Sequence, residues 1–130
     1  MKNNFVIDAS AWIEYFNGTD KGSKIKLIIE SKSNKIFTNL ITISELAIYF
    51  EKRSFDFIEP KKIIISFSQI YTPNFDFAEE AGKFTANIRR SNSKIGLADI
   101  YVFLTAQKLK GKLITCDNDF RKLKDVTIIE

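Results

Sequence analysis

Near its start the chain reads Phe5-Val6-Ile7-Asp8-Ala9-Ser10-Ala11-Trp12-Ile13. The first three of these residues are aromatic or β-branched, which is typical of a buried strand. Apolar residues then recur at positions 9, 12, 13 and 16, which is the spacing of a helix. Asp8 therefore lies where a core strand ends and a helix begins. Because binding sites in open α/β sheets form at the carboxyl ends of strands, we ask which other acids reach the same edge.

The rest of the chain continues this alternation of strands and helices. Apolar runs and turn residues predict strands over 4–8, 35–38, 71–76, 112–116 and 126–129. Helical spacing predicts helices over 9–17, 20–32, 41–53, 60–71, 77–91, 97–110 and 118–123, with a polar loop over 91–94. Such alternation predicts an α/β fold of three layers. A mostly parallel central sheet of four or five strands is flanked by helices on both faces.

Composition limits the class of protein. With 130 residues and 45% hydrophobic residues, we expect one globular domain over residues 1–130. We find no signal peptide and no apolar run of membrane-spanning length, so we expect a cytoplasmic protein without a membrane partner. Cys116 is the only cysteine and there is no histidine, which excludes a disulfide, a thiolate cluster and a histidine zinc site. The net charge of +4 fits a polyanionic partner, and equally a solubilising lysine-rich surface.

Four acids stand in unusual places. Asp8 and Asp117 each follow an apolar strand, so both belong at the same edge of a parallel sheet. Glu45 has isoleucines at i−4 and i+3 of its helix, and Asp99 is the one acid in an otherwise apolar helical run. A carboxylate at the margin of an apolar face needs a partner, because burying an unpaired charge costs several kcal/mol as an order of magnitude.

Each acid also has a purely structural interpretation. Asp8 is a suitable helix N-cap, and Asp117 with Asp119 would suit a second cap. Glu45 would then have a lysine or backbone partner, and Asp99 would complement the dipole of its helix. The agreement of all four positions favours a shared site instead. Converging carboxylates repel one another unless a cation is bound, and oxygen ligands alone select a hard ion such as Mg²⁺ or Mn²⁺.

The four acids lie in four short motifs that resemble those of the PIN-domain family. The motifs are Val6-Ile7-Asp8-Ala9-Ser10, Ile43-Ser44-Glu45-Leu46, Gly96-Leu97-Ala98-Asp99-Ile100 and Leu113-Ile114-Thr115-Cys116-Asp117-Asn118-Asp119-Phe120. They occur in the order and spacing of that family across essentially the whole chain. At this length the chain most resembles the VapC-type toxins of type II toxin–antitoxin pairs.

The resemblance implies a PIN-like sandwich and a Mg²⁺- or Mn²⁺-dependent endoribonuclease that attacks RNA with metal-activated water. By match to the motifs, the metal-binding and catalytic acids would be Asp8, Glu45, Asp99 and Asp117. Supporting roles would fall to Ser10, Thr115 and Asp119. Such toxins are usually neutralised by a small antitoxin protein and commonly form homodimers, so both are expected partners beside RNA.

Basic residues near the polar loop before Asp99 are candidates to hold RNA phosphates. They are Lys83, Arg89, Arg90 and Lys94. For any one of them, a solvated helix face explains the charge as well.

Three other functions remain open from the sequence. The first is a PIN nuclease of RNA processing that has no antitoxin. The second is a phosphate-accepting receiver domain, which would carry paired acids after the first strand and a lysine after a late strand. Here Asp8 stands alone and the late strand leads to Asp117. The third is a non-catalytic α/β binding module whose acids serve as caps and ion-pair partners.

Overall fold

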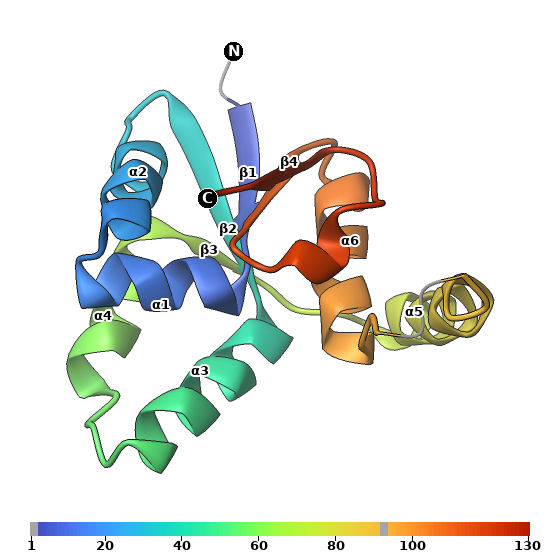
Figure 1. Ribbon diagram of the computed structural model, residues 1–130, viewed down its shortest axis with the longest axis horizontal. Coiled ribbons are helices and arrows are strands. Elements are labelled where there is room, and N and C mark those ends of the chain that lie inside the picture. The colour runs from blue at the N-terminus through green and yellow to red at the C-terminus, as the bar shows by residue number, and fades with distance from the viewer. Residues whose placement is uncertain (1–2, 92–93) are drawn as a thin grey trace.

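The computed structural model describes residues 3–91 and 94–130 (Figure 1). Its strands are β1 (Asn3–Ile7), β2 (Asn34–Asn39), β3 (Gln69–Tyr71), β4 (Lys112–Thr115) and β5 (Val126–Ile128). Its helices are α1 (Ala9–Asn17), α2 (Asp20–Ile29), α3 (Leu40–Lys52), α4 (Ile58–Phe67), α5 (Phe75–Ile88) and α6 (Leu97–Lys108), with a short 3₁₀ turn over Asn118–Phe120.

The five strands form one sheet in the order β3-β2-β1-β4-β5, and every pair is parallel. The central strand is β1, where Val6 pairs in register with Phe37 of β2 and Leu113 of β4. The predicted α/β class, with a parallel sheet of four or five strands and helices on both faces, is confirmed. All carboxyl ends therefore meet at one edge, which is the edge where Asp8 was expected to lie.

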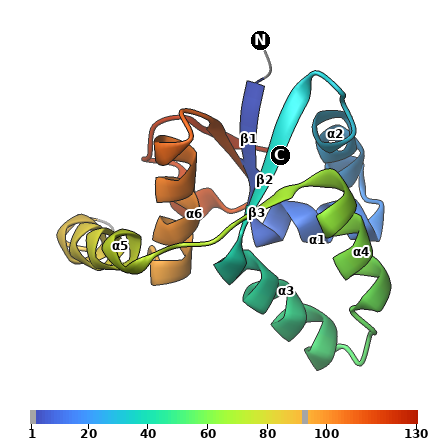
Figure 2. The same cartoon turned by 180° about the vertical axis from the view of Figure 1, so that it is seen from behind.

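Alternate side chains of the central strands enter two separate cores. Val6, Phe37 and Leu113 pack on the face covered by α5 and α6. Their neighbours Ile7, Ile36 and Ile114 pack on the opposite face, which α1, α2 and α4 cover. Figure 1 shows these two groups of helices on either side of the sheet, and Figure 2 shows the same layers from behind. Because these strands are buried on both faces, their sequences are continuous apolar runs.

Helix α3 is held in place from its first residue. Asn39, the last residue of β2, accepts a hydrogen bond on its side chain from the backbone N–H of Ile41 at 2.8 Å and so caps α3. The same side chain donates to Thr105 Oγ1 of α6 at 2.8 Å, and both residues are fully buried. This bond fixes α3 relative to α6, and these are the two helices that carry Glu45 and Asp99.

The element boundaries differ from the predicted ones mainly around β3. The helix predicted over 60–71 runs from Ile58 to Phe67, because the backbone at Ser68 turns extended and leads into β3 at Gln69–Tyr71, earlier than the strand predicted over 71–76. Helix α5 begins at Phe75, two residues before its predicted start, because the Asn74 side chain accepts the N–H of Phe77. The other boundaries agree within a few residues. The polar loop predicted over 91–94 includes residues 92–93, which lie outside the described residues.

Across residues 3–91 and 94–130, no helix combines the length and the hydropathy that crossing a membrane requires.

Candidate metal centre

The carboxyl ends of β1 and β4 bring two acids to the same edge of the sheet. Asp8 follows β1 directly, and its backbone N–H donates to the carbonyl of Ile114 in β4 at 3.0 Å. Asp117 comes two residues after β4 ends at Thr115. The pairing of these neighbouring strands thus places Asp8 beside the turn that carries Asp117, as the sequence pattern predicted.

Asp8 is 5% exposed and is held by two hydroxyl groups. Ser10 Oγ and Thr115 Oγ1 each donate to Asp8 Oδ2 at 2.8 Å. Each hydroxyl in turn accepts a backbone N–H at 3.0 Å, Ser10 from Cys116 and Thr115 from Asp117. This network joins the ends of β1 and β4 and fixes the orientation of the Asp8 carboxylate. It gives Ser10 and Thr115 a supporting geometry, although their role in catalysis stays a prediction.

The other two acids come from helices. Asp99 lies in the first turn of α6, where its Oδ2 accepts the backbone N–H of Gly96 at 2.9 Å in a capping-box arrangement. Glu45 lies in the second turn of α3 and is half-buried. Among the described residues, no side chain or backbone group forms a hydrogen bond or ion pair with the Glu45 carboxylate.

These findings show for which of the four acids a purely structural role explains the position. The Asp8 side chain makes no capping hydrogen bond to α1, so the N-cap explanation fails for it. Glu45 lacks the lysine or backbone partner that the structural explanation required, as far as the described residues extend. Asp99 and Asp117 do act as caps, since Asp117 Oδ1 accepts the N–H of Asp119 at 2.9 Å. Capping explains their positions only in part, because both also face the cavity described next.

All four acids line one cavity of about 320 Å³ at the carboxyl edge of the sheet. Its wall consists of Asp8, Ala9, Ser10, Ile13, Glu45, Ile48, Tyr49, Lys52, Arg53, Asp99 and Asp117. A larger hollow of about 820 Å³ lies at the opposite, amino end of the strands, but Asp125 is its only carboxylate among the described residues. The concentration of acids therefore marks the smaller cavity as the chemical site.

Burial and mutual repulsion raise the pKa values of three of these acids. The pKa of Glu45 rises to about 7, first because of burial and then because of the charges of Asp8, Asp99 and Asp117. Burial also raises the pKa of Asp99 to about 6, against the lowering effect of the Gly96 hydrogen bond. Burial raises the pKa of Asp8 despite its two hydroxyl donors. The site therefore resists carrying its full negative charge without a compensating cation.

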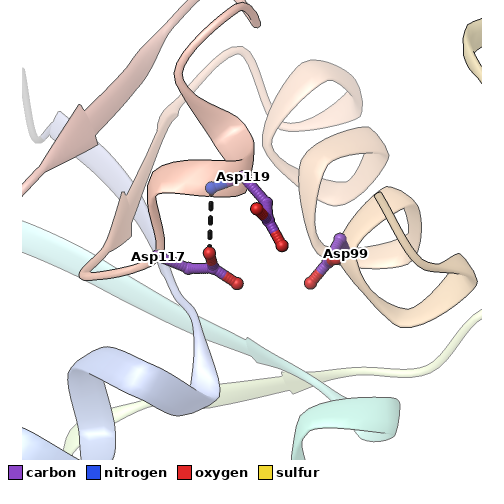
Figure 3. Close-up of side chains that lie close together, drawn as sticks. All are labelled: Asp99, Asp117 and Asp119. Atoms are coloured by element: carbon purple, nitrogen blue, oxygen red, sulfur yellow. Dashed lines mark hydrogen bonds between the residues drawn. The ribbon is translucent and has the colours of Figure 1, made fainter. Parts of the chain in front are cut away.

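Three carboxylates are close enough to bind one ion together. Asp99, Asp117 and Asp119 each offer an oxygen, and these oxygens lie within 4.8 Å of one another. Figure 3 shows the three side chains pointing towards a common space, with the hydrogen bond from Asp119 N–H to Asp117 drawn as a dashed line. The donor set contains only oxygen, which fits a hard divalent ion such as Mg²⁺ or Mn²⁺. Asp119, predicted in a supporting role, thus belongs to a group of three acids that could hold a metal ion.

The basic residues predicted to bind RNA lie outside this cavity. On α5, Lys83 forms an exposed ion pair with Glu79 at 2.9 Å. Arg89 donates from Nε to the carbonyl of Ile95 at 3.1 Å and so supports the segment before α6. Arg90 and Lys94 are exposed. None of the four lines the acidic cavity, and their contact with RNA stays a prediction.

Two cations that were not predicted as site residues also line the cavity. They are Lys52 and Arg53, at the C-terminal end of α3. They stand seven and eight residues after Glu45, which places them on its side of the helix. Charged residues are common at exposed helix ends, so the sequence alone did not mark either residue as part of the site.

The family of this chain follows from its sequence. Residues 5–126 match the model of the PIN domain, and the chain belongs to the PIN domain family. No curated protein sequence shows a significant match.

Solved structures of toxins share the fold over nearly the whole chain. VapC20 of Mycobacterium tuberculosis, a sarcin–ricin loop cleaving toxin, has a TM-score of 0.76 at 17% identity, covering 97% of this chain and 99% of VapC20. A toxin–antitoxin complex from Klebsiella pneumoniae has a TM-score of 0.72 at 22% identity, covering 96% of this chain and 97% of the matched chain of the complex. DNA-bound VapBC from Salmonella typhimurium has a TM-score of 0.70 at 19% identity, covering 98% of this chain and 97% of the matched chain of the complex. At these identities the likeness concerns the fold.

Proposed function

We propose that this protein is a Mg²⁺- or Mn²⁺-dependent endoribonuclease. The observation that carries the proposal is the convergence of Asp8, Glu45, Asp99 and Asp117 on one cavity of a PIN domain. We assign the metal-binding and catalytic roles to these four acids, and a further carboxylate oxygen to Asp119. RNA is the proposed substrate class, because the net charge of +4 suits a polyanion and one structural neighbour is a toxin that cleaves the sarcin–ricin loop.

The protein's own groups prepare this site for an ion and a phosphodiester. A divalent ion bound there would polarise the phosphodiester, lower the pKa of an attacking water and stabilise the leaving oxygen. Ser10 and Thr115 orient the Asp8 carboxylate, which lines the cavity. Glu45 and Asp99, whose pKa values are about 7 and about 6, must release their protons for the ion to bind.

We further propose that the nuclease is a VapC-like toxin. Its fold matches toxins over almost their entire length, and one of these is a toxin that cleaves the sarcin–ricin loop. The expected partners are RNA, a small antitoxin protein and a second copy of this chain, and the expected compartment is the cytoplasm. VapBC complexes among the structural neighbours support the antitoxin partner.

The decisive experiment measures cleavage of mixed transfer and ribosomal RNA by the purified protein with Mg²⁺ or Mn²⁺, and with chelator. The tested variants are Asp8→Asn and Asp99→Asn, and Asp76→Asn is the control because Asp76 is exposed on α5. We expect metal-dependent cleavage that both site variants lose and the control retains. Cleavage that persists in both site variants would refute the proposed site.

A second measurement separates the remaining functions. Expression of the wild-type chain should arrest growth, and Asp99→Asn should relieve the arrest. RNA cleavage without growth arrest would favour a processing nuclease that has no antitoxin. A folded protein that neither cleaves RNA nor arrests growth would instead be a binding module.

A further inference from the structure

The last turns of α3 carry positive charge into the acidic cavity. Glu45, Tyr49, Lys52 and Arg53 all line it, and their spacing of four, seven and eight residues keeps them on one side of the helix. At about 1.5 Å per residue, the two cations lie roughly 10–12 Å along the helix from Glu45. One wall of the cavity is therefore negative near the sheet and positive towards its mouth.

Arg53 is held in a fixed position. Its guanidinium carbon lies 3.7 Å from the centre of the Tyr49 ring, and its Nη1 donates to the Tyr49 carbonyl at 3.1 Å. The Tyr49 hydroxyl accepts a hydrogen bond from Asn17 Nδ2 at the end of α1, at 3.1 Å. The aromatic ring is thus fixed between two helices and presents one face to the guanidinium. A cation held in this way loses little conformational entropy when it binds an anion.

Neither cation of this wall is neutralised by an acid. In the part of the chain that the structure describes, no carboxylate lies within 4.0 Å of Lys52 Nζ or the Arg53 guanidinium. Other surface cations do have such partners: Lys62 pairs with Glu59, and Lys108 with Glu80. The acids across the cavity are too far away to pair with Lys52 and Arg53. An anion that reaches the mouth of the cavity would therefore meet two available donors.

We propose that Arg53, together with Lys52, binds a backbone phosphate of the RNA substrate about three nucleotides from the bond that is cut. This inference rests on the proposed nuclease function. The distance follows from the separation of roughly 10–12 Å along α3 and a rise of about 3.4 Å per nucleotide in a stacked strand. The two residues position the strand and take no part in the chemical step. Tyr49 acts as a positioning residue for Arg53.

A purely structural role for Arg53 makes different predictions. Arg53 is the C-cap residue of α3, and its bond to the Tyr49 carbonyl satisfies an acceptor at the helix end. A cap alone would affect thermal stability and leave substrate affinity unchanged. It would also give the same result for short and long substrates, because helix stability does not depend on the length of the RNA.

The test measures KM and kcat for Arg53→Gln, Arg53→Lys and Lys52→Gln. The control is Lys62→Gln, whose lysine is exposed on α4 and pairs with Glu59 outside the cavity. One substrate is a single-stranded RNA of about 12 nucleotides around a mapped cleavage site, and the other is trimmed to one nucleotide on each side of it. Melting temperatures of all variants are measured in parallel.

For the long substrate, we expect Arg53→Gln to raise KM about five- to tenfold with kcat within about twofold of the wild type. Its salt dependence, the slope of log affinity against log salt concentration, should weaken by about 0.7 for the lost phosphate contact. The effect should vanish for the trimmed substrate. Arg53→Lys should recover part of the affinity, and the control should behave as the wild type.

Two variants of Tyr49 test the positioning of Arg53. Tyr49→Phe keeps the ring under the guanidinium but loses the bond from Asn17, so it should raise KM less than Tyr49→Leu, which should raise KM towards the value of Arg53→Gln. Unchanged KM and salt slope in Arg53→Gln, with or without a lower melting temperature, would overturn this inference alone. A wild-type protein that cleaves no RNA would overturn the proposed function, and the inference with it.

Discussion

Replacing Glu45 with glutamine should stabilise the metal-free protein while removing its activity. Burial and the charges of three aspartates raise the pKa of Glu45 from 4.5 to about 7. Because the folded protein binds this proton more tightly than the unfolded chain does, ionising Glu45 lowers the free energy of unfolding. Glutamine has nearly the same shape and no charge, so it removes this penalty.

The size of the effect follows from the change in pKa. The difference between 4.5 and about 7 corresponds to roughly 3 kcal/mol, which solvent screening at this half-exposed carboxylate reduces to about 1–2 kcal/mol. The penalty is absent below the unfolded pKa of 4.5, grows as the pH rises, and is complete above about pH 7. For a chain of this size, the gain corresponds to a melting temperature roughly 4–8 °C higher at pH 8.

Thermal and urea unfolding at pH 8 and pH 5 would measure this prediction. Most of the advantage of Glu45→Gln should disappear at pH 5. Glu51→Gln is the matched control, since Glu51 lies exposed on the same helix outside the acidic cavity. Added Mn²⁺ should stabilise the wild type more than the variant, because only the wild type keeps the full set of carboxylates. Equal or lower stability of Glu45→Gln at pH 8 without metal would refute the reasoning.

Three other substitutions test the site and the packing. Thr115→Val removes one hydroxyl donor of Asp8 and should weaken Mn²⁺ binding about 10- to 100-fold in a calorimetric titration; unchanged affinity would contradict the role of this bond. Gly22→Ala should lower the free energy of unfolding by roughly 1–3 kcal/mol in urea, because its methyl group would collide with the Glu14 carbonyl. At Gly82 an added methyl group meets open space, so Gly82→Ala should raise the free energy of unfolding by about 0.5–1 kcal/mol. If Gly22→Ala and Gly82→Ala changed this free energy equally, the packing argument would be disproved.

The edge of the sheet that carries the site could be predicted from local sequence. Asp8 and Asp117 each follow a strand whose residues are buried on both faces, so the strand pattern also gives the position of the acid. Glu45 and Asp99 were identified because each interrupts an apolar helical row. Both signals are local, since they depend on the spacing of residues within one strand or helix.

The positive wall of the cavity could not be predicted in the same way. Lys52 and Arg53 lie at the exposed end of a helix, where charged residues are common. Whether they face the acidic cavity depends on the angle between α3 and the sheet. The buried hydrogen bond from Asn39 to Thr105, two residues that are 66 positions apart in the sequence, helps to fix this angle. The strand β3 was misplaced for a similar reason, because its three residues lie at the sheet edge and are mostly exposed.

The acids of the site are compensated unequally, and this inequality supports the proposed binding of a cation. Two hydroxyl donors hold Asp8, and a backbone N–H supports Asp99, whereas Glu45 has no such donor among the described residues. Lys52 is on the same side of α3 but roughly 10 Å further along, too far to neutralise Glu45. A lysine one turn from Glu45 would stabilise the empty site and compete with a metal ion. Because no such lysine is present within the described chain, the proposed binding of a divalent ion would recover the free energy lost by ionising Glu45.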